Sequence, residues 1–278
     1  MTTREKMKPA LRAGILTIGN EVLDGHVLDT NSNWIEKQLA SLSIPMIRLA
    51  CVRDNLDEIA SGLEFLTGEC NVVITSGGLG PTHDDMTLKA LGDALGLELA
   101  EDDEALSIVK RQYKMLSKKK IVASSELTEP RMKMAHIPVG SKALDNRIGG
   151  APGVMIEQNG VHIFALPGVP GELKYIFENS VKPWLQENAT EAFFERVVEF
   201  VWKDESEFAP IIDLVMKRYP DVYIKSMPRQ YGTTKVLRVW VSSRGKSLKD
   251  LETVVQIAID LLSAEAGQTP SIVEIEYK

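Results

Sequence analysis

The chain has 278 residues, an apolar fraction of 44% and a formal net charge of −7, as expected for a globular protein with one large or two smaller domains. The acidic balance argues against general nucleic-acid binding, which requires a basic face. No apolar run approaches the roughly 18 residues of a membrane span, and no apolar segment typical of a secretory signal begins the chain. The two cysteines, Cys51 and Cys70, form no CxxC pair and are expected to be reduced thiols in or near the core. We therefore expect a cytoplasmic protein.

The first part of the chain alternates between strand-like and helix-like segments. Buried strands are predicted at 13–19, 45–52 and 71–76, and amphipathic helices follow them at 31–44, 56–66 and 88–95. This rhythm is typical of βαβ units. It predicts an α/β fold with a doubly wound, mostly parallel sheet, helices on both faces and ligands outside the carboxyl ends of the strands.

The rest of the chain predicts the end of this domain and a second one. Residues 101–135 are expected to be mostly helical, with a solvated lysine run at 118–120. Residues 153–166 predict a hairpin with its turn at Asn159-Gly160, and a helix at 171–187 closes a first domain spanning 10–187. Strands at 193–202, 221–228, 235–243 and 271–277, with helices at 205–219 and 247–266, predict a smaller α+β domain over 190–278.

The strongest chemical signal is the stretch TSGGLGPTHDD at 75–85, which connects a predicted strand to a predicted helix. Glycines allow backbone N–H groups to converge on one point, and the helix that follows contributes its positive N-terminal end. We therefore predict that the N–H groups of Gly77, Gly78 and Gly80 bind a phosphate, with Ser76 and Thr82 in the same site. The stretch matches neither the Walker pattern nor GxGxxG.

The two aspartates of this stretch would repel a phosphate unless a cation lay between them. Mg²⁺ or Mn²⁺ is commonly held by one or two carboxylates together with phosphate oxygens and water. We predict that Asp84 and Asp85 hold such an ion, joined by Glu21 and Asp54 from two other strand ends. An alternative stays open, in which Thr82 or Asp84 caps the following helix and Asp54 caps the helix after its own strand.

Several stretches together resemble the CinA family of competence/damage-inducible proteins, whose molybdopterin-binding-like domain is similar to MoaB, MogA and MoeA. The matching stretches are TIGNEVLDGHVLDTN (17–31), VRDN (52–55), TSGGLGPTHDDMT (75–87), MKMAHIPVG (132–140), NRIGGAPGV (146–154) and LPGVPGE (166–172). The second domain resembles the KH-like module of CinA proteins but has no GxxG loop, so RNA binding is not expected. Arg131 and Gly150 replace the Asn and Thr common in the family, at positions that bear on sugar or base recognition.

The resemblance implies metal-dependent hydrolysis of ADP-ribose or a related nucleotide diphosphate, with Mg, Mn or Co as the ion. Glu21, Asp84 and Asp85 would organise the ion, with Asp54 behind them. Lys133 would offset charge on the leaving phosphate. The residues expected to shape the nucleoside pocket are Asn146, Pro167, Gly168 and Gly171. The C-terminal deamidase domain of longer CinA proteins, which acts on nicotinamide mononucleotide, is not expected in this chain.

Two other functions stay open at this point. The same glycine turn could bind a pterin phosphate, in a molybdopterin-binding protein or an enzyme of molybdenum-cofactor synthesis. The chain could also be a nucleotide-binding scaffold without catalysis. In each case we expect a small-molecule ligand, no membrane association and a homo-oligomer, either a dimer or a trimer.

Overall fold

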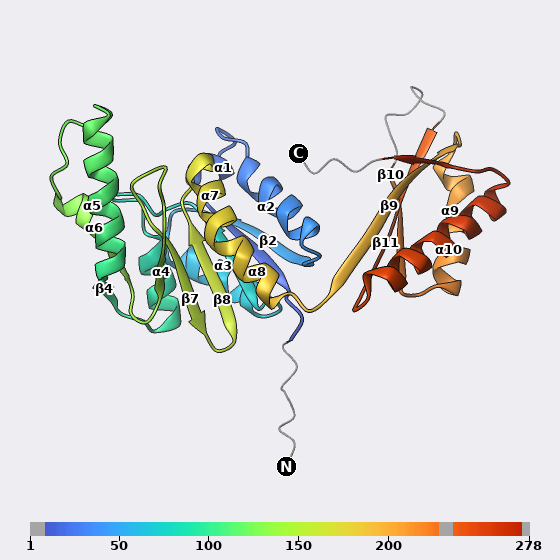
Figure 1. Cartoon of the computed structure of the whole chain (residues 1–278), viewed down its shortest axis with the longest axis horizontal. Helices are drawn as coiled ribbons and strands as arrows, with labels where there is room; N and C mark the ends of the chain where they lie inside the picture. The colour runs from blue at the N-terminus through green and yellow to red at the C-terminus, as the bar shows by residue number, and fades with distance from the viewer. Residues whose placement is uncertain (1–8, 228–235, 274–278) are drawn as a thin grey trace, which may run out of the picture. The chain divides into compact units, whose positions relative to one another are not determined.

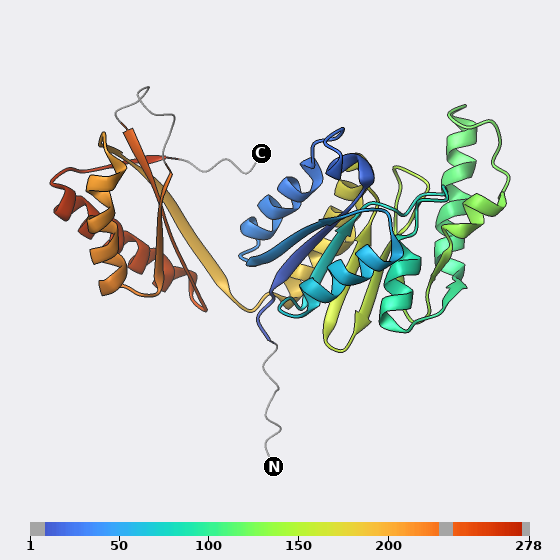
Figure 2. The same ribbon diagram turned by 180° about the vertical axis from the view of Figure 1, so that it is seen from behind.

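The computed structural model describes residues 9–227 and 236–273, and these divide into two compact units (Figures 1 and 2). Residues 11–40 and 45–189 form the first unit, and the described residues from 190 onward form most of the second. Each unit has a hydrophobic core of its own. One cluster contains buried residues between Leu16 and Ala165, and the other contains buried residues between Val198 and Leu262.

The first unit is built around a six-stranded sheet in the order β2-β1-β3-β8-β7-β6. Four strands are parallel, namely β2 (Met46–Val52), β1 (Ala13–Ile18), β3 (Val72–Ser76) and β8 (Val161–Leu166). Strand β7 (Gly153–Gln158) runs antiparallel to β8, and β6 (Lys142–Leu144) runs antiparallel to β7. Every residue of β1 and β3 is buried, as expected for central strands covered on both faces. The predicted mostly parallel sheet is confirmed.

Helices cover both faces of this sheet. One face carries α2 (Thr30–Ser41) and a continuous stretch of α7 (Pro170–Ile176), the π-helical turn η1 (Phe177–Val181) and α8 (Lys182–Asn188). Trp34 of α2 meets Phe177 edge to face, with ring centroids 5.1 Å apart. The α7–α8 stretch lies in front in Figure 1, and α3 (Leu56–Thr67) and α4 (Thr87–Leu95), on the other face, lie in front in Figure 2.

Short elements account for most differences from the sequence prediction. The helical region predicted at 101–135 contains α5 (Asp103–Lys118) and α6 (Glu129–Lys133), but residues 119–128 between them are not helical. Strands β4 (Leu99–Glu101), β5 (His136–Pro138) and β6 have three residues each, too few to show a periodic pattern. A short helix, α1 (Asn20–Leu23), follows β1. The hairpin turn is as predicted, with φ of 53° at Asn159 and 78° at Gly160.

The second unit is a small α+β unit, as predicted. Its strands form an antiparallel sheet in the order β10-β11-β9-β12, with bounds β9 (Ala192–Val201), β10 (Val222–Met227), β11 (Val236–Gly245) and β12 (Ser271–Val273). Helices α9 (Glu205–Arg218) and α10 (Leu248–Ala266) pack on one face of this sheet (Figure 1). The last predicted strand, 271–277, extends beyond the described residues. No helix in the described ranges is long and apolar enough to cross a membrane.

Candidate functional site

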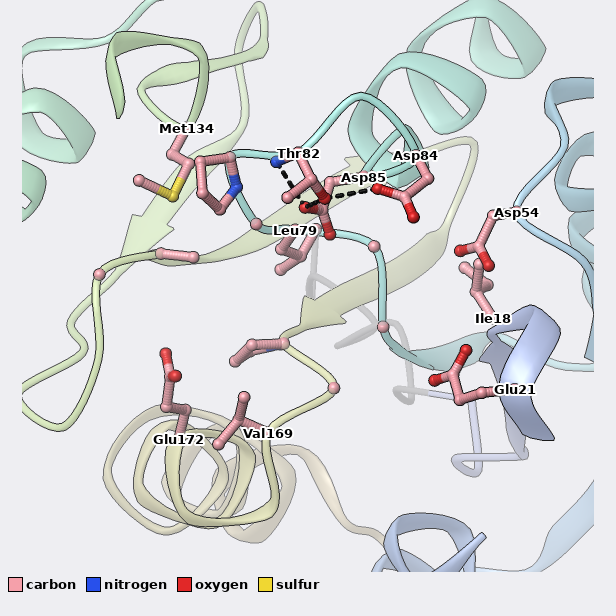
Figure 3. A pocket seen from close by; sticks show the side chains of 18 of the residues that line it. Ile18, Glu21, Asp54, Leu79, Thr82, Asp84, Asp85, Met134, Val169 and Glu172 are labelled. Atoms are coloured by element: carbon pink, nitrogen blue, oxygen red, sulfur yellow. Dashed lines mark hydrogen bonds between the residues drawn. The ribbon is translucent and has the colours of Figure 1, made fainter. Parts of the chain in front are cut away.

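A pocket of about 630 Å³ lies where β1, β3 and β8 end (Figure 3). Small-molecule sites in open α/β sheets occupy this edge and have volumes of this order. The pocket brings together residues that are up to 154 positions apart, from Ile18 to Glu172. The predicted site residues that line it are Glu21, Asp54, Gly77, Gly78, Gly80, Thr82, Asp84, Asp85, Pro167 and Gly168.

The glycine turn is required by the packing of the chain itself. Gly77 and Gly78 have φ values of +115° and +66°, which side-chain-bearing residues rarely adopt. A Cβ on Gly77 would lie 2.1 Å from the carbonyl oxygen of Ile18, and a Cβ on Gly78 would lie 2.2 Å from Thr87 Oγ1. The two glycines therefore let the end of β3 pass close to β1 and to the start of α4.

Hydrogen bonds around the turn decide which N–H groups are available to a ligand. The Gly77 N–H donates to Leu166 O at 3.0 Å, so the prediction that this group binds phosphate is wrong. Thr87 fixes the next two peptides, because its hydroxyl donates to Gly77 O at 2.9 Å and its N–H donates to Gly78 O at 3.2 Å. In a trans peptide the N–H points opposite to the C=O. The N–H groups of Gly78 and Leu79 therefore point away from α4, and those of Gly78, Leu79 and Gly80 have no hydrogen-bond partner among the described residues.

Both aspartates of the loop are held by Thr82. The Thr82 N–H donates to Asp85 Oδ2 at 2.8 Å, and the Thr82 hydroxyl contacts one carboxylate oxygen of each aspartate. A Cβ on Gly80 would lie 2.5 Å from Asp85 Oδ2, so the Asp85 carboxylate faces the glycine turn. The hydrogen bond from Thr82 lowers the pKa of Asp84 and favours its charged form. Lys133 does not line the pocket, but its Nζ donates to Thr82 O and places a positive charge beside the loop.

The capping alternative for these residues is wrong. Helix α4 begins at Thr87, after Met86, and within the described residues no side chain caps it. Thr82 and Asp84 instead belong to the separate turn that Thr82 and Asp85 close. Their hydrogen bonds shape the pocket loop, and the helix does not depend on them.

Asp54 also has a role other than helix capping. The cap of α3 is Asn55, whose Oδ1 accepts from the N–H groups of Asp57 and Glu58 at 3.0 and 3.2 Å. Asp54 Oδ2 accepts from the N–H of Asn20 at 2.8 Å, which joins the end of β2 to the start of α1. Burial raises the pKa of Asp54, and the charges of Glu21 and Asp84 raise it further.

The four predicted metal ligands, Glu21, Asp54, Asp84 and Asp85, therefore share one pocket. Among the described residues, however, no group of three or more His, Cys, Asp or Glu side chains is arranged to hold a metal ion. Mg²⁺ usually takes only one or two carboxylates and completes its shell with phosphate oxygens and water. The arrangement fits an ion that is shared with a bound phosphate, and it does not provide a cage made of protein ligands alone.

Asn31 connects two loops of the pocket and was missed at the sequence level. Its Nδ2 donates to Ser76 Oγ at 2.9 Å and to Gly168 O at 2.8 Å, so it ties the end of β3 to the loop after β8. Ser76 is thus buried behind the turn and does not line the pocket, contrary to prediction, and neither does Gly171, in the first turn of α7. The only sequence signal for Asn31 was its place at the end of TIGNEVLDGHVLDTN.

Asn146 is fully buried and supports the pocket from behind. Its Nδ2 donates to Ala151 O and to Glu172 Oε2, both at 2.7 Å. Its Oδ1 accepts from the N–H groups of Ile148 and Gly149 at 2.9 and 3.1 Å. Its hydrogen-bonding capacity is used inside the loop, so Asn146 shapes the predicted nucleoside pocket by positioning Glu172 and not by touching a ligand.

The pocket also has apolar lining residues, most of which were not predicted. They include Leu79, Pro81, Tyr113, Met134, Ala151 and Val169. The Arg131 guanidinium lies 4.0 Å from the centroid of the Tyr113 ring, and a Cβ on Gly150 would lie 3.1 Å from the same ring. Arg131 and Gly150, the two departures from the CinA pattern, thus both contact one pocket residue.

Comparison with known proteins agrees with this geometry. A family model described as a probable molybdopterin binding domain matches residues 14–187, a range that includes every residue lining the pocket. A protein of Pyrobaculum aerophilum is 36% identical over 94% of this chain and 97% of its own length, and a protein of Thermococcus kodakarensis is 37% identical over 91% and 99%.

Among solved structures, the protein CinA of Thermoplasma acidophilum, described as having unknown function, is 34% identical and superposes with a TM-score of 0.57. That match covers 63% of this chain and 98% of the CinA chain. The predicted resemblance to CinA is confirmed, and the chain belongs to the family of probable molybdopterin binding domains.

Proposed function

We propose that the chain is a metal-dependent hydrolase that cleaves the diphosphate bond of ADP-ribose or a related nucleotide diphosphate. One observation carries the proposal: the N–H groups of Gly78 and Gly80, which have no partner in the described part of the chain, share a pocket with the carboxylates of Asp84 and Asp85. N–H groups without partners favour an anion, whereas carboxylates favour a cation. A diphosphate with a divalent ion satisfies both.

The reaction adds one water molecule across the P–O–P link. A new P–O bond forms at one phosphorus, the bridging P–O bond at that phosphorus breaks, the bridging oxygen leaves with the other phosphate, and the proton of the water passes to solvent. A bound divalent ion would neutralise phosphate charge and acidify water.

The chain itself would supply positioning and charge. The N–H groups of Gly78, Leu79 and Gly80 would hold one phosphate, since Thr87 fixes two of these peptides in place. Asp84 and Asp85 would orient the ion, with Glu21 and Asp54 at the same end of the pocket (Figure 3). Lys133, held against the Thr82 carbonyl, would offset the charge that develops on the leaving phosphate.

A second candidate function is the binding of a pterin phosphate in molybdopterin chemistry. The description of the matching family favours it. The same N–H groups would hold the phosphate, and the apolar lining residues of the pocket would cover the pterin ring. Tight pterin binding without turnover of any nucleotide diphosphate would support this candidate, whereas nucleotide binding without turnover would support a non-catalytic scaffold.

The test is a substrate panel of ADP-ribose, FAD, NADH and nucleoside diphosphate sugars, each with Mg²⁺, Mn²⁺ or Co²⁺. We expect ADP-ribose turnover that stops when the metal is chelated. The double variant Asp84→Ala, Asp85→Ala should lower kcat/KM at least about 100-fold, because the ion loses its protein ligands. Asp93→Ala is the matched control, since Asp93 lies on α4, pairs with Lys89 and does not line the pocket. Unchanged turnover in the double variant would refute the roles assigned to Asp84 and Asp85.

The expected homo-oligomer, a dimer or a trimer, stays a prediction. Light scattering of the purified chain measures its mass directly, and a monomer would contradict it.

A further inference from the structure

The Glu172 carboxylate is built into the wall of the pocket. A Cβ on Gly149 would lie 2.0 Å from Glu172 Cδ, so only glycine at that position leaves room for the carboxylate. Gln112 Nε2 donates to Gly149 O at 2.9 Å and holds the loop there from α5. In Figure 3 Glu172 and Met134 lie on the opposite side of the pocket from Glu21 and Asp54. A ligand whose phosphates lie at the end of the pocket near Glu21 and Asp54 would extend toward Glu172.

Asn146 determines which oxygen of Glu172 faces a ligand. The Asn146 amide cannot be turned over, because its Oδ1 accepts from two backbone N–H groups and its Nδ2 donates to Ala151 O. Its remaining N–H therefore points at Glu172 Oε2, 2.7 Å away. The other oxygen, Oε1, has no hydrogen-bond partner among the described residues, and Glu172 lines the pocket. The wall thus offers one fixed hydrogen-bond acceptor to a ligand in the pocket.

We propose that Glu172 is a specificity-determining residue, whose Oε1 accepts a hydrogen bond from the exocyclic amino group of a heterocyclic base in a phosphate-linked ligand. This inference rests on the proposed binding of phosphate at the glycine turn. A carboxylate accepts from an amino N–H and meets a ring carbonyl with repulsion, since both are acceptors. Adenine carries an amino group at C6, and guanine and pterins carry one at C2. Hypoxanthine carries neither.

The test compares the affinities of ADP, GDP and IDP, measured by calorimetry in the presence of Mg²⁺, for the native chain and for Glu172→Gln. We expect the native chain to bind ADP or GDP at least about tenfold more tightly than IDP. A difference in affinity of this size is typical of one hydrogen bond to a charged group. ADP and IDP differ at C6, and GDP and IDP differ at C2, so the tighter ligand identifies which amino group is recognised.

The Glu172→Gln variant should lose this preference without a change of shape. The Asn146 N–H will pair with the glutamine oxygen, and the glutamine NH₂ will then occupy the position of Oε1 as a donor. Glu187→Gln is the matched control, an exposed glutamate on α8 that does not line the pocket. Should Glu172→Gln fold poorly, Glu172→Asp keeps the charge but withdraws it by one methylene, and the amino preference should fall in that variant too.

The outcomes separate this inference from the proposed function when ADP-ribose hydrolysis is measured on the same samples. Loss of the amino preference in Glu172→Gln without any hydrolysis supports the role of Glu172 and rejects the hydrolase. If ADP-ribose is hydrolysed but the native chain shows no preference for ADP or GDP over IDP, the role of Glu172 alone is rejected. The same holds if the native chain and Glu172→Gln show an equal preference. Failure of all three nucleotides to bind rejects both.

Discussion

At the scale of single residues, the pocket is shaped by side chains that donate all their N–H groups to other parts of the protein. The Asn146 amide donates to Ala151 O and to Glu172, and its oxygen accepts from two backbone N–H groups of the same loop. The Asn31 amide donates to Ser76 Oγ and to Gly168 O. Such residues do not line the pocket, but they fix groups that do. Glu172 is the clearest example, since its position follows from Asn146.

The protonation of Glu172 should appear in the pH dependence of stability. Burial raises the pKa of Glu172, and the hydrogen bond from Asn146 opposes this shift only in part. In the window between its ordinary pKa and this raised pKa the folded chain binds more protons than the unfolded chain, so the free energy of unfolding falls as pH rises. The stabilising contribution is complete below the ordinary pKa and is lost once pH exceeds the raised value.

We therefore expect Glu172→Gln to gain stability relative to the native chain as pH rises from below the ordinary pKa of a glutamate to above the raised pKa of Glu172. Urea unfolding at several pH values measures the difference, with Glu187→Gln as control. A difference that does not change with pH would contradict the shift.

At the scale of elements, the glycine turn works only with the start of α4. Thr87, fully buried at the first turn of that helix, holds the carbonyls of Gly77 and Gly78 and so directs the two N–H groups that follow. Helix and turn are thus one structural unit. The proposed binding of phosphate would then depend on a threonine that does not line the pocket.

Thr87→Val tests this coupling, because valine keeps the shape and removes the hydroxyl. We expect the free energy of unfolding to fall by about 1–3 kcal/mol, the cost of leaving a buried carbonyl without a partner. The affinity for inorganic phosphate with Mg²⁺ should fall as well, because the Gly78 N–H is no longer fixed. Thr87→Ser retains the donor and should bind phosphate nearly as the native chain does. Equal phosphate affinity in the Val and Ser variants would show that the hydroxyl does not orient the turn.

At the scale of the whole molecule, the two units have separate cores. The buried cluster around β1 and β3 contains residues of the first unit, and the cluster around Phe200 and Phe208 contains residues of the second. The pocket belongs entirely to the first unit. Stability of the second unit and ligand binding in the first should therefore respond to different substitutions.

Phe208→Ala tests that separation. Phe208 is fully buried between Phe200 and Trp202, with ring centroids 4.9 and 5.2 Å away, so its truncation should cost about 3–5 kcal/mol. Amide hydrogen exchange should show the loss of protection in β9, α9 and β11, while ADP binding stays within about twofold of native, since the pocket shares no core residue with Phe208. A parallel loss of protection in β1 and β3 would show that the units unfold together.

Local pattern was enough to predict most of the long elements. The buried strands β1 and β3 and the amphipathic helices α3 and α4 carry their own periodicity, and the Asn159-Gly160 turn carries its own backbone preference. Three-residue strands such as β4 and β5 have no such pattern, and pairing with each other is what makes them strands.

For the site, the sequence by itself determined that glycines and carboxylates gather at one edge of the sheet, because the carboxyl ends of its parallel strands all lie there. Only the tertiary structure decided which groups are available to a ligand. The Gly77 N–H donates to Leu166 O, in a residue 89 positions further along the chain. The Asn146 side chain makes its hydrogen bonds within its own loop and to Glu172. The physical reason is that a hydrogen bond between distant segments occupies a donor without leaving any mark on the local sequence around it.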